Sequence, residues 1–152
     1  MIVGVVSDTH GRMHPGVLDA LDGCERIVHA GDVGDAAILV RLASIAPLTA
    51  VRGNVDRDGR QASLPATGVL VCEGRSLYVI HDLADLDVDP AARGMAAVIS
   101  GHSHVPKIEW RQDVLYLNPG SCGPRRFRHP ITLARLAIEG GTLSAELITL
   151  EP

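Results

Sequence analysis

The stretch Ile2-Val3-Gly4-Val5-Val6-Ser7-Asp8-Thr9-His10-Gly11 begins with an apolar run and stops abruptly at polar residues. A run that is apolar on both faces predicts a buried strand of a layered α/β fold. In such folds ligands bind at the carboxyl ends of the strands, where Asp8 and His10 stand. Both side chains are good ligands for a hard or borderline metal ion. A helix N-cap at Ser7 or Asp8, beside an unrelated histidine, is the alternative.

The same pattern, an apolar run followed by a polar candidate ligand, recurs along the chain. Its later instances end at Gly31-Asp32, Gly53-Asn54, His81-Asp82, Gly101-His102-Ser103-His104 and Asn118-Pro119-Gly120-Ser121. The spacing between the successive candidates is roughly 20 to 30 residues, the size of one strand and its return connection. We therefore expect successive strands to deliver these ligands to the same edge of one sheet.

Composition limits the class of protein. The 152 residues are enough for one domain with a real core, so a single domain over residues 1–152 is expected. Hydrophobic residues make up 46% and aromatic residues only 3%, which predicts a core of Val, Ile, Leu and Ala. The net charge of −4 argues against a general nucleic-acid-binding surface and against a polybasic membrane anchor.

The cysteines and the N-terminus indicate the compartment. Cys24, Cys72 and Cys122 are odd in number and far apart, so neither a disulfide framework nor a zinc knuckle is expected. The chain enters a strand at once, without a basic leader segment, and no apolar run approaches the roughly 18 residues of a membrane span. A cytoplasmic protein is predicted.

Periodicity predicts the order of the elements. Helices are expected over residues 15–21 and 34–45, with strands over 27–30 and 48–51 and a polar loop over 54–65. Later segments predict a strand from Ala96, a short helix around 90–93, and hairpins over 69–80, 107–117 and 132–150. Strand–helix alternation followed by hairpins favours two sheets packed face to face, with helices outside.

The candidate ligands together comprise two carboxylates, one amide oxygen and four imidazoles: Asp8, Asp32, Asn54, His10, His81, His102 and His104. This set is too large for one tetrahedral ion and suits two divalent ions that share a bridging carboxylate. Nitrogen and oxygen ligands without thiolate favour Mn, Fe, Zn, Ni or Co over Ca. Two such ions can bridge a hydroxide and hold both oxygens of an in-line displacement.

This ligand series resembles the calcineurin-like metallophosphoesterase superfamily over nearly the whole chain. The segments Gly53-Asn54-Val55-Asp56 and Asn118-Pro119-Gly120-Ser121, in a short chain, are most similar to the YfcE-type phosphodiesterase branch. The resemblance implies an α/β fold, a four-layer αββα sandwich of two mixed sheets. It also implies a dinuclear site at one edge and a hydrolase whose bridging hydroxide attacks phosphorus.

The resemblance also implies a role for each ligand. Asp8, His10 and His104 would bind the first metal, while Asn54, His81 and His102 would bind the second. Asp32 would bridge the two ions and, with Asn54 and His81, act directly in catalysis. Mn²⁺ is the expected ion, with Ni²⁺, Zn²⁺, Fe²⁺ and Co²⁺ as alternatives.

Two positions depart from the common pattern of the superfamily. Val55 stands where many members carry a histidine. The YfcE-type branch likewise lacks that histidine, so the assignment stands but an obvious general acid is missing. Asp56 is a candidate substitute, with a helix cap or a loop salt bridge to Arg57 as the alternative. Asp82 follows His81, where glycine is commoner; it could orient His81 or a neighbour, or cap the next helix.

Charge arithmetic supports an anionic substrate, because two divalent ions outweigh two carboxylates and a hydroxide. Arg125, Arg126 and Arg128 could bind a distal phosphate, or they could form a solvated basic loop. His29 is expected to be buried behind the ligands, His14 and His129 to lie on the surface, and Cys122 to be a small loop residue.

The sequence therefore predicts a metal-dependent phosphodiesterase that hydrolyses a small phosphate ester. A phosphomonoesterase or phosphoprotein phosphatase on the same scaffold is an alternative. A non-catalytic scaffold, similar to the retromer subunit with this fold, is another. An exposed hairpin edge could also pair with a second copy of the chain.

Overall fold

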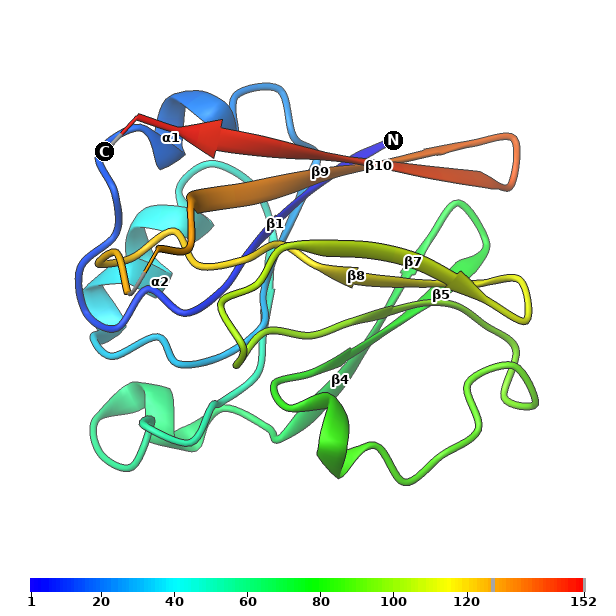
Figure 1. Cartoon of the computed structure of the whole chain (residues 1–152), viewed down its shortest axis with the longest axis horizontal. Coiled ribbons are helices and arrows are strands. Elements are labelled where there is room, and N and C mark those ends of the chain that lie inside the picture. The colour runs from blue at the N-terminus through cyan, green and yellow to red at the C-terminus, as the bar shows by residue number, and fades with distance from the viewer. Residues whose placement is uncertain (127, 152) are drawn as a thin grey trace.

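Two five-stranded sheets stacked face to face form the body of the computed structural model, which describes residues 1–126 and 128–151 (Figure 1). The order of the first sheet is β10-β9-β1-β2-β3. Its strands are β1 (Ile2–Val6), β2 (Arg26–His29), β3 (Leu48–Ala50), β9 (Ile131–Glu139) and β10 (Thr142–Leu150). The three N-terminal strands run parallel, and the predicted C-terminal hairpin adds antiparallel to β1.

The order of the second sheet is β4-β5-β6-β8-β7. Its strands are β4 (Thr67–Cys72), β5 (Arg75–Ile80), β6 (Met95–Ile99), β7 (Lys107–Arg111) and β8 (Val114–Asn118). The three central strands run parallel, and the two edge strands belong to the hairpins that the sequence predicts. Aliphatic side chains of both sheets fill the layer between them, as the low aromatic content led us to expect.

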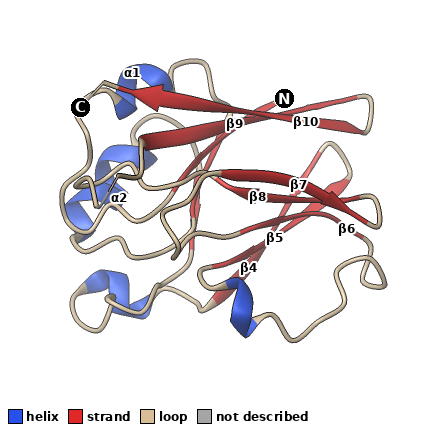
Figure 2. Ribbon diagram, viewed as in Figure 1, coloured by secondary structure: helices blue, strands red, loops and turns tan. Residues whose placement is uncertain are grey.

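Helices cover the outer face of the first sheet (Figure 2). They are α1 (Val17–Ala20) and α2 (Ala36–Ala43), and α2 begins at Asp35, whose carboxylate accepts a hydrogen bond from the Ala37 N–H. The outer face of the second sheet is covered by a thinner layer, in which Leu83, Leu86 and Val88 pack on the sheet. The layers are those of the αββα sandwich.

Some local predictions were wrong. The helix around 90–93 is a single turn, in which the Arg93 N–H donates to the Asp89 carbonyl at 3.1 Å. A short 3₁₀ helix, η2 (Leu83–Asp85), precedes it, and another, η1 (Arg60–Ser63), lies in the polar loop. The first predicted helix, over residues 15–21, is shorter than expected and covers only Val17–Ala20.

Within the described residues, no helix is long and apolar enough to cross a membrane. Cys24, Cys72 and Cys122 are buried as free thiols.

Candidate metal centre

The seven candidate ligands lie on loops that follow five strands. Asp8 and His10 follow β1, Asp32 follows β2 and Asn54 follows β3, all in the first sheet. The other three come from the second sheet, His81 after β5 and His102 and His104 after β6. The prediction of a single sheet edge was therefore wrong. Because the parallel strands of both sheets end at the same side of the sandwich, the two sets of loops face one another.

Asp8, His10 and His104 form one group, whose nearest nitrogen and oxygen atoms all lie within 4.8 Å of one another. The Nε2 atoms of the two histidines are 3.2 Å apart. Asp8 Oδ1 lies 3.6 Å from His10 Nε2 and 3.4 Å from His104 Nε2. This is the trio that the resemblance assigns to the first metal.

Asp32, His81 and His102 form the second group. His81 Nε2 lies 3.3 Å from Asp32 Oδ2. Asn54 joins this group, because its Oδ1 lies 3.0 Å from His81 Nε2 and 3.2 Å from His102 Nδ1. Asp32 Oδ2 is also 3.6 Å from His10 Nε2, so this carboxylate faces both groups.

The chemistry of these atoms fits divalent cations. Within the described part of the chain, Asp8 Oδ1 and His104 Nδ1 are buried without a hydrogen-bond partner. Buried polar atoms are rarely left in this state unless a bound ion or water satisfies them. Mixed carboxylate, amide and imidazole donors, with no thiolate, suit the metals named from the sequence.

Neighbouring groups, most of them on the backbone, leave one atom of Asp8, Asp32 and His81 turned toward the other ligands. Asp8 Oδ2 accepts hydrogen bonds from Ser7 Oγ at 2.6 Å and from the His102 N–H at 3.0 Å, which leaves Oδ1 for a cation. Asp32 Oδ1 accepts from the Val55 N–H at 3.0 Å. His81 Nδ1 donates to the Ala30 carbonyl at 2.8 Å, so the lone pair of that ring is on Nε2.

The charges within the groups attract one another strongly. Burial would raise the pKa of Asp8, but hydrogen bonds with His10, His104 and Ser7 outweigh burial and lower it. Burial would likewise lower the pKa of His81, yet its contact with Asp32 and the charge of Asp8 raise it. Without a metal the two carboxylates therefore stay ionised and favour a proton on His81, so a proton would compete with a metal ion for that ring.

The backbone of the ligand loops is unusual. Positive φ angles between 48° and 71° occur at Asp8, His10, Asp32, His102 and His104. For residues other than glycine this left-handed conformation costs on the order of 1 kcal/mol each, and such strain clusters at functional sites. Tight turns at the strand ends are what aim successive side chains at one point.

Asp56 has a different role from the general acid considered above. Its side chain is buried, and its Oδ2 accepts from the N–H groups of Val33 at 3.1 Å and Gly53 at 2.9 Å. Its Oδ1 accepts from the Gly34 N–H at 3.0 Å. Both oxygens are thus used in tying the loop after β2 to the loop after β3, and the geometry gives no support to an acid role.

Asp82 does two things. Its Oδ1 caps η2 by accepting from the Ala84 N–H at 3.0 Å. Its Oδ2 lies 3.6 Å from His102 Nε2, so the histidine it adjoins is His102 and not the preceding residue His81.

Two residues behind the ligands hold the ligand loops, and the expected burial of His29 is confirmed. His29 is fully buried: its Nδ1 accepts from the Gly31 N–H at 3.1 Å, and its Nε2 lies 3.0 Å from Thr9 Oγ1. Burial lowers the pKa of His29 to about 4. Asn118 Nδ2 donates to the Gly101 carbonyl at 3.0 Å and to Ser103 Oγ at 3.1 Å. The Asn118 motif was visible in the sequence, but its action on the loop after β6 was not.

The other polar candidates lie away from the ligands. Arg125, Arg126 and Arg128 are exposed, and Arg125 lines a separate hollow beside β10. His14 contacts the Glu151 carbonyl near the C-terminal end of the described chain. Cys122 is fully buried, which raises the pKa of its thiol to about 12.

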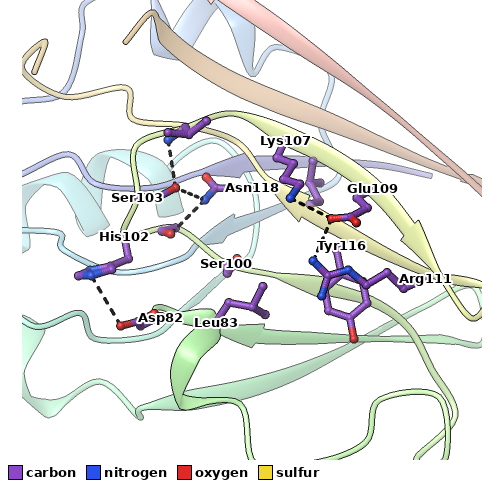
Figure 3. Close-up of a pocket in the computed structure, with 13 residues that line it drawn as sticks. Asp82, Leu83, Ser100, His102, Ser103, Lys107, Glu109, Arg111, Tyr116 and Asn118 are labelled. Atoms are coloured by element: carbon purple, nitrogen blue, oxygen red, sulfur yellow. Dashed lines mark hydrogen bonds and ion pairs between the residues drawn. The ribbon is translucent and has the colours of Figure 1, made fainter. Parts of the chain in front are cut away.

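Two cavities flank the ligands. One, of about 330 Å³, extends from His102 along β7 and β8, where Figure 3 shows Lys107, Glu109 and Arg111 at the far end. The other, of about 350 Å³, is lined by Asn54, His81 and His102. His102 and Asp82 line both cavities. Of the described residues that line them, none belongs to the arginine-rich segment 125–128.

Solved structures share this fold. An archaeal phosphodiesterase is 20% identical, with a TM-score of 0.77 over 97% of this chain and 100% of that chain. A Vps29 of Entamoeba histolytica complexed with Zn²⁺ is also 20% identical, with a TM-score of 0.75 over 98% of this chain and 99% of that chain. At this identity the likenesses show the fold alone.

Sequence comparison defines the family. A probable metallophosphoesterase of Methanothermobacter thermautotrophicus is 34% identical over 160 residues, which cover 97% of this chain and 92% of the relative. The sequence pattern of the calcineurin-like phosphoesterase superfamily domain matches residues 1–141. The chain therefore belongs to the calcineurin-like phosphoesterase superfamily.

Proposed function

We propose that this protein is a metal-dependent phosphodiesterase that hydrolyses a small phosphodiester with the help of two divalent ions. The observation that carries the proposal is the convergence of seven ligand side chains from both sheets on one point, where Asp8 Oδ1 is buried without a hydrogen-bond partner. In the proposed arrangement Asp8, His10 and His104 hold one ion and Asn54, His81 and His102 hold the other. Asp32, which faces both groups, is shared.

When bound, such ions supply a nucleophile from water near neutral pH and positive charge for the phosphoryl oxygens. Mn²⁺ is the first choice, and the bound Zn²⁺ of the related Vps29 fold keeps zinc among the alternatives. We also propose a cytoplasmic location, which the three buried, unpaired thiols of the described residues support.

The chain's own residues hold the ligands in place. Ser7 and the His102 N–H orient Asp8, while the Val55 N–H orients Asp32. The Val55 side chain is 42% exposed next to Asn54 and can neither donate nor accept a proton. We therefore assign protonation of the leaving alkoxide to solvent, which favours esters with good leaving groups.

The two flanking cavities favour a diester over a monoester. A phosphodiester carries two organic arms, and each cavity can take one arm while the phosphate lies between them at His102. A monoester has one arm and would leave one cavity without a substrate group. Phosphomonoester hydrolysis is thus the second activity to test on this scaffold.

A scaffold role is the remaining alternative, since a Vps29 shares this fold as the archaeal phosphodiesterase does. The test is hydrolysis of a chromogenic phosphodiester beside its matching monoester, in chelated protein and after adding back Mn²⁺, Ni²⁺, Zn²⁺ or Mg²⁺. We expect metal-dependent turnover of the diester that Asp32→Asn abolishes while the circular dichroism spectrum is kept. Folded, metal-loaded protein that turns over neither ester would contradict the proposal and favour a scaffold.

A further inference from the structure

The cavity along β7 and β8 has a polar end remote from the ligands. Lys107, Glu109 and Arg111 alternate along β7 and line the cavity together with Tyr116 of β8 (Figure 3). The sequence Lys107-Ile108-Glu109-Trp110-Arg111 has the period of two that places its three charged residues on one face of a strand. The volume of the cavity, about 330 Å³, lies at the lower end of the range for small-molecule sites, ~300–1,000 Å³.

Contacts hold the guanidinium of Arg111 in a defined position. Its Nη2 donates to Glu109 Oε2 at 2.9 Å, and its Cζ lies 4.6 Å from the centroid of the Tyr116 ring. Lys107 Nζ lies 3.0 Å from the same Glu109 oxygen. An arginine that is stacked on a ring and paired at one edge loses less freedom when it binds an anion, because its plane is already fixed.

Donors remain for a ligand. A guanidinium carries five N–H donors, and within the described residues Arg111 directs only Nη2 to an acceptor. Two cations share one carboxylate, so the far end of the cavity carries a net positive charge. The neighbouring cavity differs, since Asp85 and Asp87 line it and not the first cavity, against the single cation Arg52; Asp82 lines both.

The wall between the two ends is partly apolar. Leu83 and Val105 both line the cavity, and Figure 3 shows Leu83 between the His102 end and the Arg111 end. Such a wall suits the carbon skeleton of an alcohol and leaves its polar terminus for Arg111.

We propose that this cavity binds one arm of the phosphodiester substrate, an alcohol whose far end carries a carboxylate or a phosphate that pairs with Arg111 and Lys107. The inference rests on the proposed phosphodiesterase function and specifies the class of its substrate. The acidic residues of the second cavity repel the same anionic arm, so a substrate with one charged arm binds in one orientation.

The test compares matched chromogenic diesters. One series carries p-nitrophenol and a straight alkanol, from butyl to octyl; the others carry the same chains with a terminal carboxylate or a terminal phosphate. In the Mn²⁺-loaded protein, kcat/KM for the best anionic ester should exceed that of its neutral analogue by about tenfold, the size of one charge-assisted hydrogen bond. The carboxylate and phosphate series show which terminus is preferred.

Variants separate this subsite from general attraction. Arg111→Gln should remove the preference, mainly by raising KM for the anionic esters. Glu109→Gln removes the carboxylate that competes for Arg111, so it should increase the preference for anionic esters. Arg41→Gln, at an exposed arginine of α2, is the matched control and should change neither the preference for anionic esters nor their KM.

A binding measurement keeps the two proposals distinguishable. Non-hydrolysable phosphonates of the anionic and neutral probes are titrated into metal-free and Mn²⁺-loaded protein by calorimetry. Hydrolysis without an anionic preference, or a preference that Arg111→Gln leaves intact, overturns the subsite and spares the phosphodiesterase. Tighter binding of the anionic phosphonate that depends on Arg111, without hydrolysis of any ester, overturns the phosphodiesterase and upholds the anion site.

Discussion

At the scale of single residues, the ligand loops tolerate almost no added volume. Gly101 precedes His102, and a Cβ atom placed there would lie 2.0 Å from Ser7 Oγ and 2.6 Å from Asp8 Oδ2. Both contacts are shorter than real Cβ atoms make, so the Asp8 carboxylate would have to move.

Gly101→Ala should therefore weaken metal binding by roughly 10- to 100-fold, the usual effect of disturbing groups that orient a ligand. Competition with a chelating dye measures the affinity. The control is Gly68→Ala, whose new Cβ would make contacts of 3.7 Å, within ordinary van der Waals range. Equal metal affinity in both variants would show that Asp8 is not a ligand.

His29 gives a prediction about pH. Its pKa is lowered from 6.5 to about 4 by burial, so as the pH falls the unfolded chain takes up this proton first. The associated stability is complete above about pH 6.5 and is lost between about pH 6.5 and 4, to a total of about 3 kcal/mol.

Urea denaturation of chelated protein across this range should show the loss, and His29→Gln should flatten the slope. His14→Gln, at a partly exposed histidine, is the control and should keep the wild-type slope. A slope shared by all three proteins would mean that His29 does not titrate in this way.

At the scale of elements, the turn between β7 and β8 departs from ideal chemistry. Gln112 and Asp113 both have positive φ angles, of 51° and 62°. A two-residue hairpin turn of this kind favours Asn followed by Gly, which adopt the conformation with little strain.

Replacement of Gln112-Asp113 by Asn-Gly should therefore raise the free energy of unfolding by about 1 kcal/mol. Chemical denaturation measures the change in the free energy of unfolding. As the control, the same variant is assayed for turnover of neutral esters. A loss of stability would contradict the assigned turn geometry.

The sequence predicted elements well where one local pattern determines them. Apolar runs located the strands, and β1 has the predicted bounds Ile2–Val6. The segment 83–94 was less predictable, because scattered Leu and Val residues there pack on the second sheet without forming a regular helix. Asp56 was misread for a similar reason: its partners Val33 and Gly34 lie more than twenty residues away in the sequence, on another loop.

At the scale of the whole molecule, the sequence predicted which side chains come together but not the way they are divided between the sheets. The spacing of Asp8, Asp32 and Asn54 matched successive strands of one parallel sheet. It could not reveal that the chain passes to the second sheet before His81, because a hairpin strand continues the same spacing. As a result each ligand group joins the two sheets: Asp8 and His10 meet His104, and Asp32 meets His81 and His102.

Because each ligand group contains residues from both sheets, a bound metal ion should stabilise the folded sandwich as well as take part in catalysis. An ion held by Asp8 on one sheet and by His104 on the other binds the folded protein only, so it should stabilise the fold by about 2.7 kcal/mol at a hundredfold excess over its dissociation constant. Mn²⁺ should therefore raise the melting temperature of chelated protein, and hydrogen exchange should slow in the loops after both β1 and β6. Asp32→Asn, which affects both groups, should reduce the rise, whereas Asp19→Asn on α1 should not. If protection appeared in the loops of one sheet alone, or if Asp32→Asn kept the full rise, the ions would bind elsewhere and the two sheets would not be joined through them.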